Sequence, residues 1–188
     1  MTLAWNDPNK NKFATAFLNY ARTVSPVTQD NSQPADTLAE TIIPGNSLDC
    51  AAVSDPGAPN TVDYSTNSNI TGKAVPGRNL NRIVDKTDGK HAEMKILDAL
   101  VAVPPYIGIS KRCCLLCDLA LNIANVGRRG CHGQLFDAWK FPTYISSNPA
   151  RLQAFLGPVA YGTYSQLSQP NQKEALRLIE TNLKQYDH

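Results

Sequence analysis

The sequence predicts an α/β domain, and three adjoining segments carry this prediction. Residues 90–100 follow the turn signal Asp88-Gly89 and place apolar side chains at helical spacing. Residues 106–110 follow two prolines and form a short apolar run that is typical of a buried strand. Residues 114–126 predict a second apolar helix. A strand between two helices is typical of a layered α/β domain, where both helix N-termini can meet at one sheet edge.

The length and composition predict a single domain over residues 1–188. A chain of 188 residues can bury a sizeable core, and a hydrophobic content of 42% is typical of a globular protein. No apolar run approaches the roughly 20 residues that span a membrane, so we expect no membrane partner. The first residues lack the apolar core of a signal peptide, although a domain cut from a longer secreted protein would look the same.

Residues 1–87 are expected to hold an N-terminal helix, strands and long loops. Within residues 11–22, after Pro8, apolar side chains recur at helical spacing, which predicts a core-facing helix. These side chains are Phe13, Phe17, Leu18 and Ala21.

Two strands are predicted next, at 36–43 and 49–53, joined by a turn at Pro44-Gly45-Asn46. Residues 55–60 then predict a loop, and residues 69–75 either add a short strand or extend that loop.

The C-terminal part, residues 143–188, is expected to be helical. Residues 148–156 predict a short helix, and residues 173–184 predict an amphipathic one. Leu176, Ile179 and Leu183 would face inward. Ahead of these helices, residues 131–136 predict a further strand.

The chemistry lies in the central segment, residues 88–142. His91 stands at the start of the first predicted helix, and Cys114 and Cys117 stand at the start of the second. One imidazole and two thiolates suit zinc, and a helix N-terminus stabilises negatively charged thiolates. Three protein ligands leave a fourth position for water, which is the catalytic rather than the structural arrangement.

Glu93 is the candidate general acid/base. It lies two residues after His91, so it can reach a metal-bound water without binding the metal. Zinc lowers the pKa of such a water towards about 7, and a nearby carboxylate can carry a proton from water to a leaving amine. Either motif alone would be a weak signal, since Cys-x-x-Cys also occurs as a redox pair.

Cysteine use favours metal binding over disulfides. Three of the five cysteines lie within five positions, and the full set is Cys50, Cys113, Cys114, Cys117 and Cys131. A disulfide framework would be more evenly spaced in a smaller chain, so we favour metal binding in a reducing compartment. Cys50 and Cys131 are expected to be small buried apolar side chains, and a ligand role for Cys113 or Cys131 stays open.

Charge is unevenly distributed along the chain. The net charge is +2 at pH 7, whereas residues 1–72 carry −4 and residues 73–140 carry +5. A positive field around a cleft favours an anionic substrate such as a polynucleotide. The alternative interpretation is a solvated charged face.

The two motifs resemble those of the zinc-dependent cytidine and nucleic-acid deaminases, whose pattern is His-x-Glu followed by Pro-Cys-x-x-Cys. By that resemblance His91, Cys114 and Cys117 would hold zinc. Glu93 would be the general acid/base, and Cys113 stands where the pattern has proline.

A closer resemblance covers about residues 88–142. Residues 106–117 and 128–139 are similar to a deaminase branch found among bacterial toxin domains and many fungal proteins, which has a histidine matching His132. Candidate substrate contacts in these segments are Ser110, Lys111, Arg112, Arg128, Arg129, His132 and Trp139. Trp139, Phe141 and Tyr144 could stack an unpaired base, while nearby basic residues hold its backbone. The basic residues are Arg128, Arg129 and Lys140. The alternative is that Trp139 and Phe141 belong to the core.

The resemblance implies a cytidine deaminase-like three-layer α/β/α sandwich with a mixed sheet of about five strands. It implies zinc-dependent deamination of cytosine in nucleic acid by a toxin or effector domain. Single-stranded DNA is favoured, with double-stranded DNA and RNA left open. Such a domain would act in the cytoplasm of the producing cell or of a target cell, and a tight immunity protein would be an expected partner.

Two other functions stay open. One is deamination of a free nucleoside or nucleotide. The other is a non-catalytic zinc-bound interaction module, in which Cys113 or Cys131 would close the fourth zinc position. Glu93 argues against the module, because a structural site needs no carboxylate beside its metal.

Overall fold

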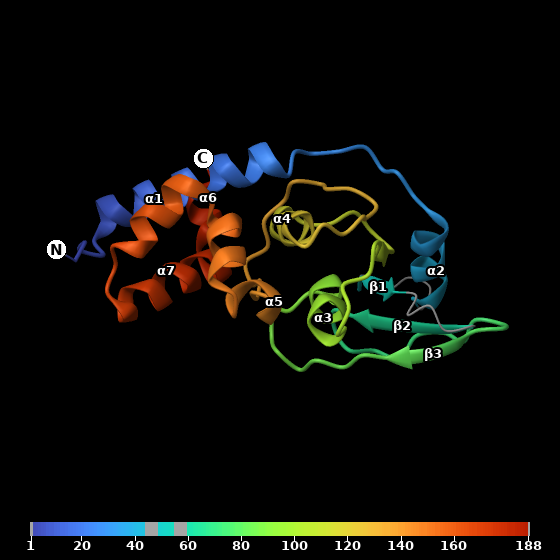
Figure 1. Cartoon of the computed structure of the whole chain (residues 1–188). Coiled ribbons are helices and arrows are strands. Elements are labelled where there is room, and N and C mark those ends of the chain that lie inside the picture. Colours follow the sequence, from blue (N-terminus) through green and yellow to red (C-terminus); the bar gives the residue numbers. More distant parts are fainter. Residues whose placement is uncertain (1, 44–48, 55–59, 188) are drawn as a thin grey trace.

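The computed structural model describes residues 2–43, 49–54 and 60–187, and it has helices on both faces of a mixed sheet (Figure 1). The helices are α1 (Asp7–Val24), α2 (Pro34–Ile42), α3 (Ala92–Ala99), α4 (Leu115–Ile123), α5 (Thr143–Ser146), α6 (Pro149–Ser165), α7 (Gln169–Thr181) and the 3₁₀ helix η1 (Leu183–Tyr186). The strands are β1 (Ala51–Ser54), β2 (Thr61–Thr66), β3 (Asn79–Arg82) and β4 (Gly108–Ile109).

The sheet has the strand order β3-β2-β1-β4. β1 runs antiparallel to both β2 and β4, while β2 and β3 are parallel. In the register, Val53 pairs with Tyr64 on one side and with Gly108 on the other. The described residues thus form four strands, somewhat fewer than the five or so expected from the resemblance.

Successive side chains of β1 pack against different helices on the two faces of the sheet. Val53 packs in a cluster with Ala39 and Ile42 of α2, whereas Ala52, one position earlier, joins the core that contains Ile96 of α3. Successive strand side chains point to opposite faces, so α2 covers one face and α3 covers the other. This confirms the predicted three-layer α/β/α sandwich.

The larger core joins α3 and α4 to a group of C-terminal helices that packs with α1 (Figure 1). Phe17 of α1 stacks on Phe155 of α6, with ring centroids 5.5 Å apart. The predicted helices at 11–22, 148–156 and 173–184 are confirmed as α1, α6 and α7, although α6 continues past a kink at Gly157, where φ is 73°. None of the described helices combines the length and apolar character needed to cross a bilayer.

The strand predicted at 36–43 is wrong, because those residues lie mainly in α2. Pro34 occupies the first turn, and a reciprocal capping box joins Gln33 and Asp36, both of which are signals of a helix start. The Asp36 carboxylate also accepts hydrogen bonds from the Ile109 amide (2.7 Å) and the Tyr106 hydroxyl (2.6 Å), which fixes α2 to β4.

The other predicted strands and loops are partly confirmed, partly wrong and partly outside the described residues. The strand at 49–53 is confirmed as β1, shifted by two residues, and residues 69–75 form no strand. The strand predicted at 131–136 is wrong, since only Cys131 bridges to the main chain of Cys113. The predicted turn at 44–46 and residues 55–59 of the predicted loop lie outside the described residues.

Candidate active site

The N-terminus of α3 positions His91. The preceding turn contains Gly89 with φ at +74°, a conformation that favours glycine, and His91 follows as the N-cap of α3. Between them Lys90 is buried, and its ammonium group lies 2.7 Å from Asp85 and 2.6 Å from Asp98. These ion pairs hold the main chain beside His91 in place.

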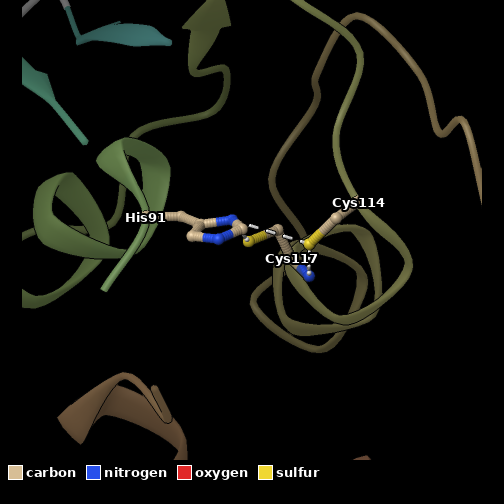
Figure 2. Close-up of side chains that lie close together, drawn as sticks. All are labelled: His91, Cys114 and Cys117. Carbon is tan, nitrogen blue, oxygen red and sulfur yellow. Dashed lines mark hydrogen bonds between the residues drawn. The ribbon is translucent and has the colours of Figure 1, made fainter. Parts of the chain in front are cut away.

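The N-terminus of α4 positions the two sulfurs. Cys114 is the N-cap of α4, and its Sγ accepts a hydrogen bond from the Cys117 amide at 3.4 Å. Figure 2 shows the side chains of His91, Cys114 and Cys117 pointing toward one another. His91 Nδ1 lies 3.7 Å from Cys114 Sγ and 3.3 Å from Cys117 Sγ.

These distances are compatible with a shared zinc ion. Zn–S and Zn–N bonds of about 2.3 and 2.0–2.1 Å at tetrahedral angles give an N···S edge of about 3.6 Å, which the two observed N···S distances bracket. The three ligand atoms all lie within 4.8 Å of one another. In the part of the chain that the structure describes, no fourth histidine, cysteine or carboxylate joins this group. His91, Cys114 and Cys117 could therefore hold a metal ion.

The electrostatics of the sulfurs also suit a cation. Burial opposes ionisation of the Cys114 thiol, but hydrogen bonds with Cys117 and His91 outweigh it and lower the pKa of Cys114 to about 6. Burial, reinforced by the neighbouring Cys114, raises the pKa of Cys117 well above its ordinary value. The pair therefore favours a single negative charge, and a cation would stabilise the second thiolate.

Glu93 lies in the first turn of α3 with only 3% of its surface exposed. Its Oε2 is buried and has no hydrogen-bond partner among the described residues. The carboxylate charge acts on all three candidate ligands, since it contributes to the pKa shifts of His91, Cys114 and Cys117. Native proteins rarely leave such an atom unpaired, so Glu93 points to a missing polar partner at the site.

Three of the predicted substrate contacts, Ser110, Lys111 and Arg112, precede the N-terminus of α4. Ser110 accepts a hydrogen bond from the Ala51 amide at 3.0 Å, which fixes it at the sheet edge. Arg112 donates to the main-chain oxygen of Thr28 at 2.7 Å, and Lys111 is exposed. Their contact with a substrate stays a prediction.

The two neighbouring arginines are engaged in ion pairs inside the protein. Arg128 forms a bidentate pair with Asp118, with both N···O distances 2.7 Å. Arg129 pairs with both Asp30 and Glu40. A role in phosphate binding also stays a prediction, and phosphate would have to compete with these carboxylates.

Trp139 and His132 take different positions. Trp139 is 1% exposed, which favours the core interpretation over a base platform. His132 lies in the loop after Cys131, where its Nδ1 accepts from the Gln134 amide at 3.1 Å. Burial and the neighbouring Arg112 lower the pKa of His132. His132 does not join the three-residue metal-type group.

Phe136 was missed by the sequence prediction, although it lies within the segment that carries the family resemblance. Its ring is 48% exposed and makes edge contacts with His91 (5.2 Å between centroids) and His132 (5.9 Å). An exposed aromatic ring directly against a candidate metal ligand is a natural surface for a planar substrate. Its exposure could not be read from the sequence, because the strand predicted at 131–136 does not form and Phe136 lies in an irregular segment.

The remaining cysteines lie apart from the metal-type group. Cys113 and Cys131 are buried and are neighbours through a main-chain bridge. Burial raises the pKa of Cys131 to about 11 and that of Cys50 to about 12. Cys131 is thus the small buried side chain that was expected. Cys50 is only partly buried, because some of its surface stays accessible to solvent.

Comparison with known proteins agrees with this site. Residues 90–143, which contain both motifs, match the model of the OTT_1508_deam-like deaminase family. No curated protein and no solved structure gives a significant match to the chain. The matched segment, which contains the His/Cys/Cys group, is thus similar to a deaminase family, and this similarity supports the resemblance of the two motifs to the cytidine deaminase-like proteins.

Proposed function

We propose that this chain is a zinc-dependent hydrolytic deaminase that converts cytosine to uracil in nucleic acid, with single-stranded DNA as the favoured substrate. One observation carries the proposal: the three-residue metal-type group lies beside a buried carboxylate, one oxygen of which has no hydrogen-bond partner among the described residues. Both lie in the segment that matches a deaminase family. A purely structural metal site would have no use for that carboxylate.

His91, Cys114 and Cys117 would hold one zinc ion, which when bound supplies a Lewis acid that makes water nucleophilic at neutral pH. Glu93 accepts a proton from the attacking water and delivers it to the ring nitrogen N3 of cytosine. The water oxygen bonds to C4, and the bond between C4 and the exocyclic amine then breaks. Glu93 passes the remaining proton to the departing ammonia, so that water and cytosine become uracil and ammonia.

A base in a single strand suits the exposed surroundings of the site. The Phe136 ring offers an apolar face beside His91, and aromatic side chains stack unpaired bases with little sequence preference. Exposed Lys111 and half-buried Arg112 adjoin the start of α4 and would attract the phosphate backbone. A duplex substrate would first have to flip its base out, at a cost of a few kcal/mol.

The biological setting belongs to the same proposal and rests on resemblance alone. A toxin or effector domain of this kind would act in the cytoplasm of the producing cell or of a target cell. An immunity protein that covers the site would be its natural inhibitor.

The proposal is tested by incubating zinc-loaded protein with a cytosine-containing single-stranded DNA oligonucleotide and measuring uracil. Parallel reactions use duplex DNA, RNA and free cytidine, and Glu93→Ala serves as the inactive variant. Glu174→Ala, on the exposed face of α7 (side chain 54% exposed), controls for the loss of a carboxylate.

We expect uracil from the parent and from Glu174→Ala but none from Glu93→Ala. Ammonia from free cytidine alone would instead assign the chain to the nucleoside or nucleotide deaminases. Inactivity on every substrate, together with zinc held by four protein ligands, would support the non-catalytic interaction module.

A further inference from the structure

Trp139 is held rigidly between the C-terminal helices and the candidate metal site. Its indole ring stacks on Phe155 of α6 (5.8 Å between centroids, 11° between planes) and meets Phe141 edge-on at 5.0 Å. Its amide donates to the Glu180 carbonyl oxygen of α7 at 2.9 Å. The next amide, that of Lys140, donates to the Gly89 carbonyl oxygen at 3.2 Å, so this segment also lies against the turn before His91.

The polar end of the indole is directed at a candidate ligand. Trp139 Nε1 donates a hydrogen bond to Cys117 Sγ at 3.2 Å. The indole has a single donor and no acceptor, and a buried tryptophan N–H normally requires a partner. Cys117 is fully buried and Trp139 is 1% exposed, so water does not replace either group in this bond.

With this bond each sulfur of the group receives one N–H donor. Cys114 Sγ accepts from the Cys117 amide at 3.4 Å, and Cys117 Sγ accepts from the Trp139 indole. A cysteine must lose its proton to bind a metal, and a buried negative sulfur needs hydrogen bonds to offset its lost hydration. The helix supplies the first donor automatically, whereas the second comes from a residue 22 positions further along the chain.

We propose that Trp139 is a positioning residue of the metal site: its Nε1–H fixes the Cys117 sulfur and stabilises it as a metal ligand. This inference rests on the proposed metal-dependent function. It assigns the tryptophan a role that neither motif contains, and it links the candidate site to Phe155 of α6, on which the indole stacks. Loss of such an outer hydrogen bond typically weakens metal binding by about 10–100-fold.

The test compares Trp139→Phe with Trp5→Phe. Phenylalanine keeps an aromatic ring on Phe155 but removes the N–H. Trp5 is the only other tryptophan of the chain and packs edge-on against Phe13 at 5.6 Å, so it controls for the exchange itself. Zinc affinity is measured by chelator competition, and the thiolate-to-cobalt charge-transfer band is recorded on the Co²⁺-substituted proteins.

We expect Trp139→Phe to bind zinc about 10–100-fold more weakly and to shift the cobalt band, while Trp5→Phe matches the parent in both. Equal zinc affinity and an unchanged band in Trp139→Phe would overturn the inference while leaving the metal site and the deaminase proposal intact. A parent protein that binds no metal would overturn both together.

A measurement on the parent protein avoids dependence on the folding of the variant. In ¹⁵N-labelled protein the two indole N–H resonances are assigned with Trp5→Phe, and ¹¹³Cd²⁺ is then added. The Trp139 resonance should move and show a coupling to ¹¹³Cd through the N–H···S bond, whereas the Trp5 resonance should not. A Trp139 resonance that is insensitive to the metal would contradict the inference.

Discussion

Two clusters of charged and polar side chains flank α4, and they differ in how their groups are satisfied. In the arginine cluster, defined as Arg128 with Asp118 and Arg129 with Asp30 and Glu40, both guanidinium groups have carboxylate partners. In the metal-type cluster, defined as His91, Glu93, Cys114 and Cys117, two sulfurs crowd one imidazole, and Glu93 Oε2 has no partner among the described residues.

This difference distinguishes a cluster that is satisfied within the protein from one that can bind a ligand. In the arginine cluster each guanidinium group already has a carboxylate partner within the protein, so the cluster needs no ligand to satisfy its cations. A buried cluster with an excess of electron-pair donors is stable only if a cation and its associated polar ligands complete it. The basic residues stand out in the sequence because of their charge, yet it is the metal-type cluster, which contains no arginine or lysine, that has a carboxylate oxygen without a partner among the described residues.

The largest expected effect comes from removing a sulfur of the metal-type cluster. Cys114→Ala removes one of three ligands and the sulfur that accepts the Cys117 amide, so stoichiometric zinc binding should be lost. Cys131→Ala removes an equally buried sulfur outside the cluster and should retain one zinc per chain. Metal content after dialysis measures both. Loss of zinc in Cys131→Ala would extend the ligand set and favour a structural site.

Next in size is the effect of Glu93→Gln, which keeps the shape of the side chain but removes its ability to carry protons. Deaminase activity should fall by about 100- to 10,000-fold, the usual contribution of a general acid/base. Zinc affinity should stay near that of the parent, because Glu93 is not a ligand in this account. An active Glu93→Gln enzyme would refute the assigned role, and the amount of uracil formed in the oligonucleotide per hour provides the comparison.

A smaller effect is expected in the arginine cluster. Asp118→Ala leaves the Arg128 charge buried, since the two side chains are only 18% and 4% exposed. Breaking such a pair costs about 3–5 kcal/mol of the free energy of unfolding, which urea denaturation measures. The double variant Asp118→Leu with Arg128→Met should recover most of this loss, because no unpaired charge remains.

Whatever stability they lose, the Asp118 variants should keep their zinc affinity. Under conditions where each variant is folded, it should match that of the parent protein. A strong loss of zinc in folded Asp118→Ala would mean that the two clusters act as one.

The smallest effect is expected for Arg129→Ala. Its partners Asp30 and Glu40 are 48% and 47% exposed, and exposed ion pairs contribute about 0–1 kcal/mol. If the internal pairs fully occupy Arg129, oligonucleotide affinity and its salt dependence should not change. A shallower salt dependence would show that Arg129 exchanges its carboxylates for phosphate, and it would support the prediction that Arg129 contacts the substrate.

The parts of this structure that local patterns encode were predictable. His91 and Cys114 act as N-caps of apolar helices, so motif spacing alone brought three candidate ligands to neighbouring helix starts. The sequence predicts a strand at α2 because Thr41, Ile42 and Ile43 have high strand propensity. The helix-start signals at Gln33 and Pro34 carry less weight in that prediction. α2 is also stabilised from a distance by contacts of Asp36 with β4.

Long-range contacts could not be predicted from one sequence. β2 is missing from the sequence prediction although Val62 and Tyr64 alternate with polar residues there. Its polar positions Asp63 and Ser65 are buried as well, and that burial depends on the elements packed around the sheet. The partners of Arg129, Asp30 and Glu40, precede it by about a hundred positions. The bond from Trp139 to Cys117 and the exposure of Phe136 likewise depend on the path of an irregular segment.

The most direct test of the central claim is the coordination of bound zinc, measured by X-ray absorption at the zinc edge of the loaded protein. The account predicts two sulfur ligands at about 2.3 Å and two lighter ligands at about 2.0–2.1 Å. The lighter ligands would be one histidine nitrogen and one exchangeable oxygen. Three or four sulfur ligands, or no bound zinc, would contradict the claim that the metal-type cluster is an open catalytic site.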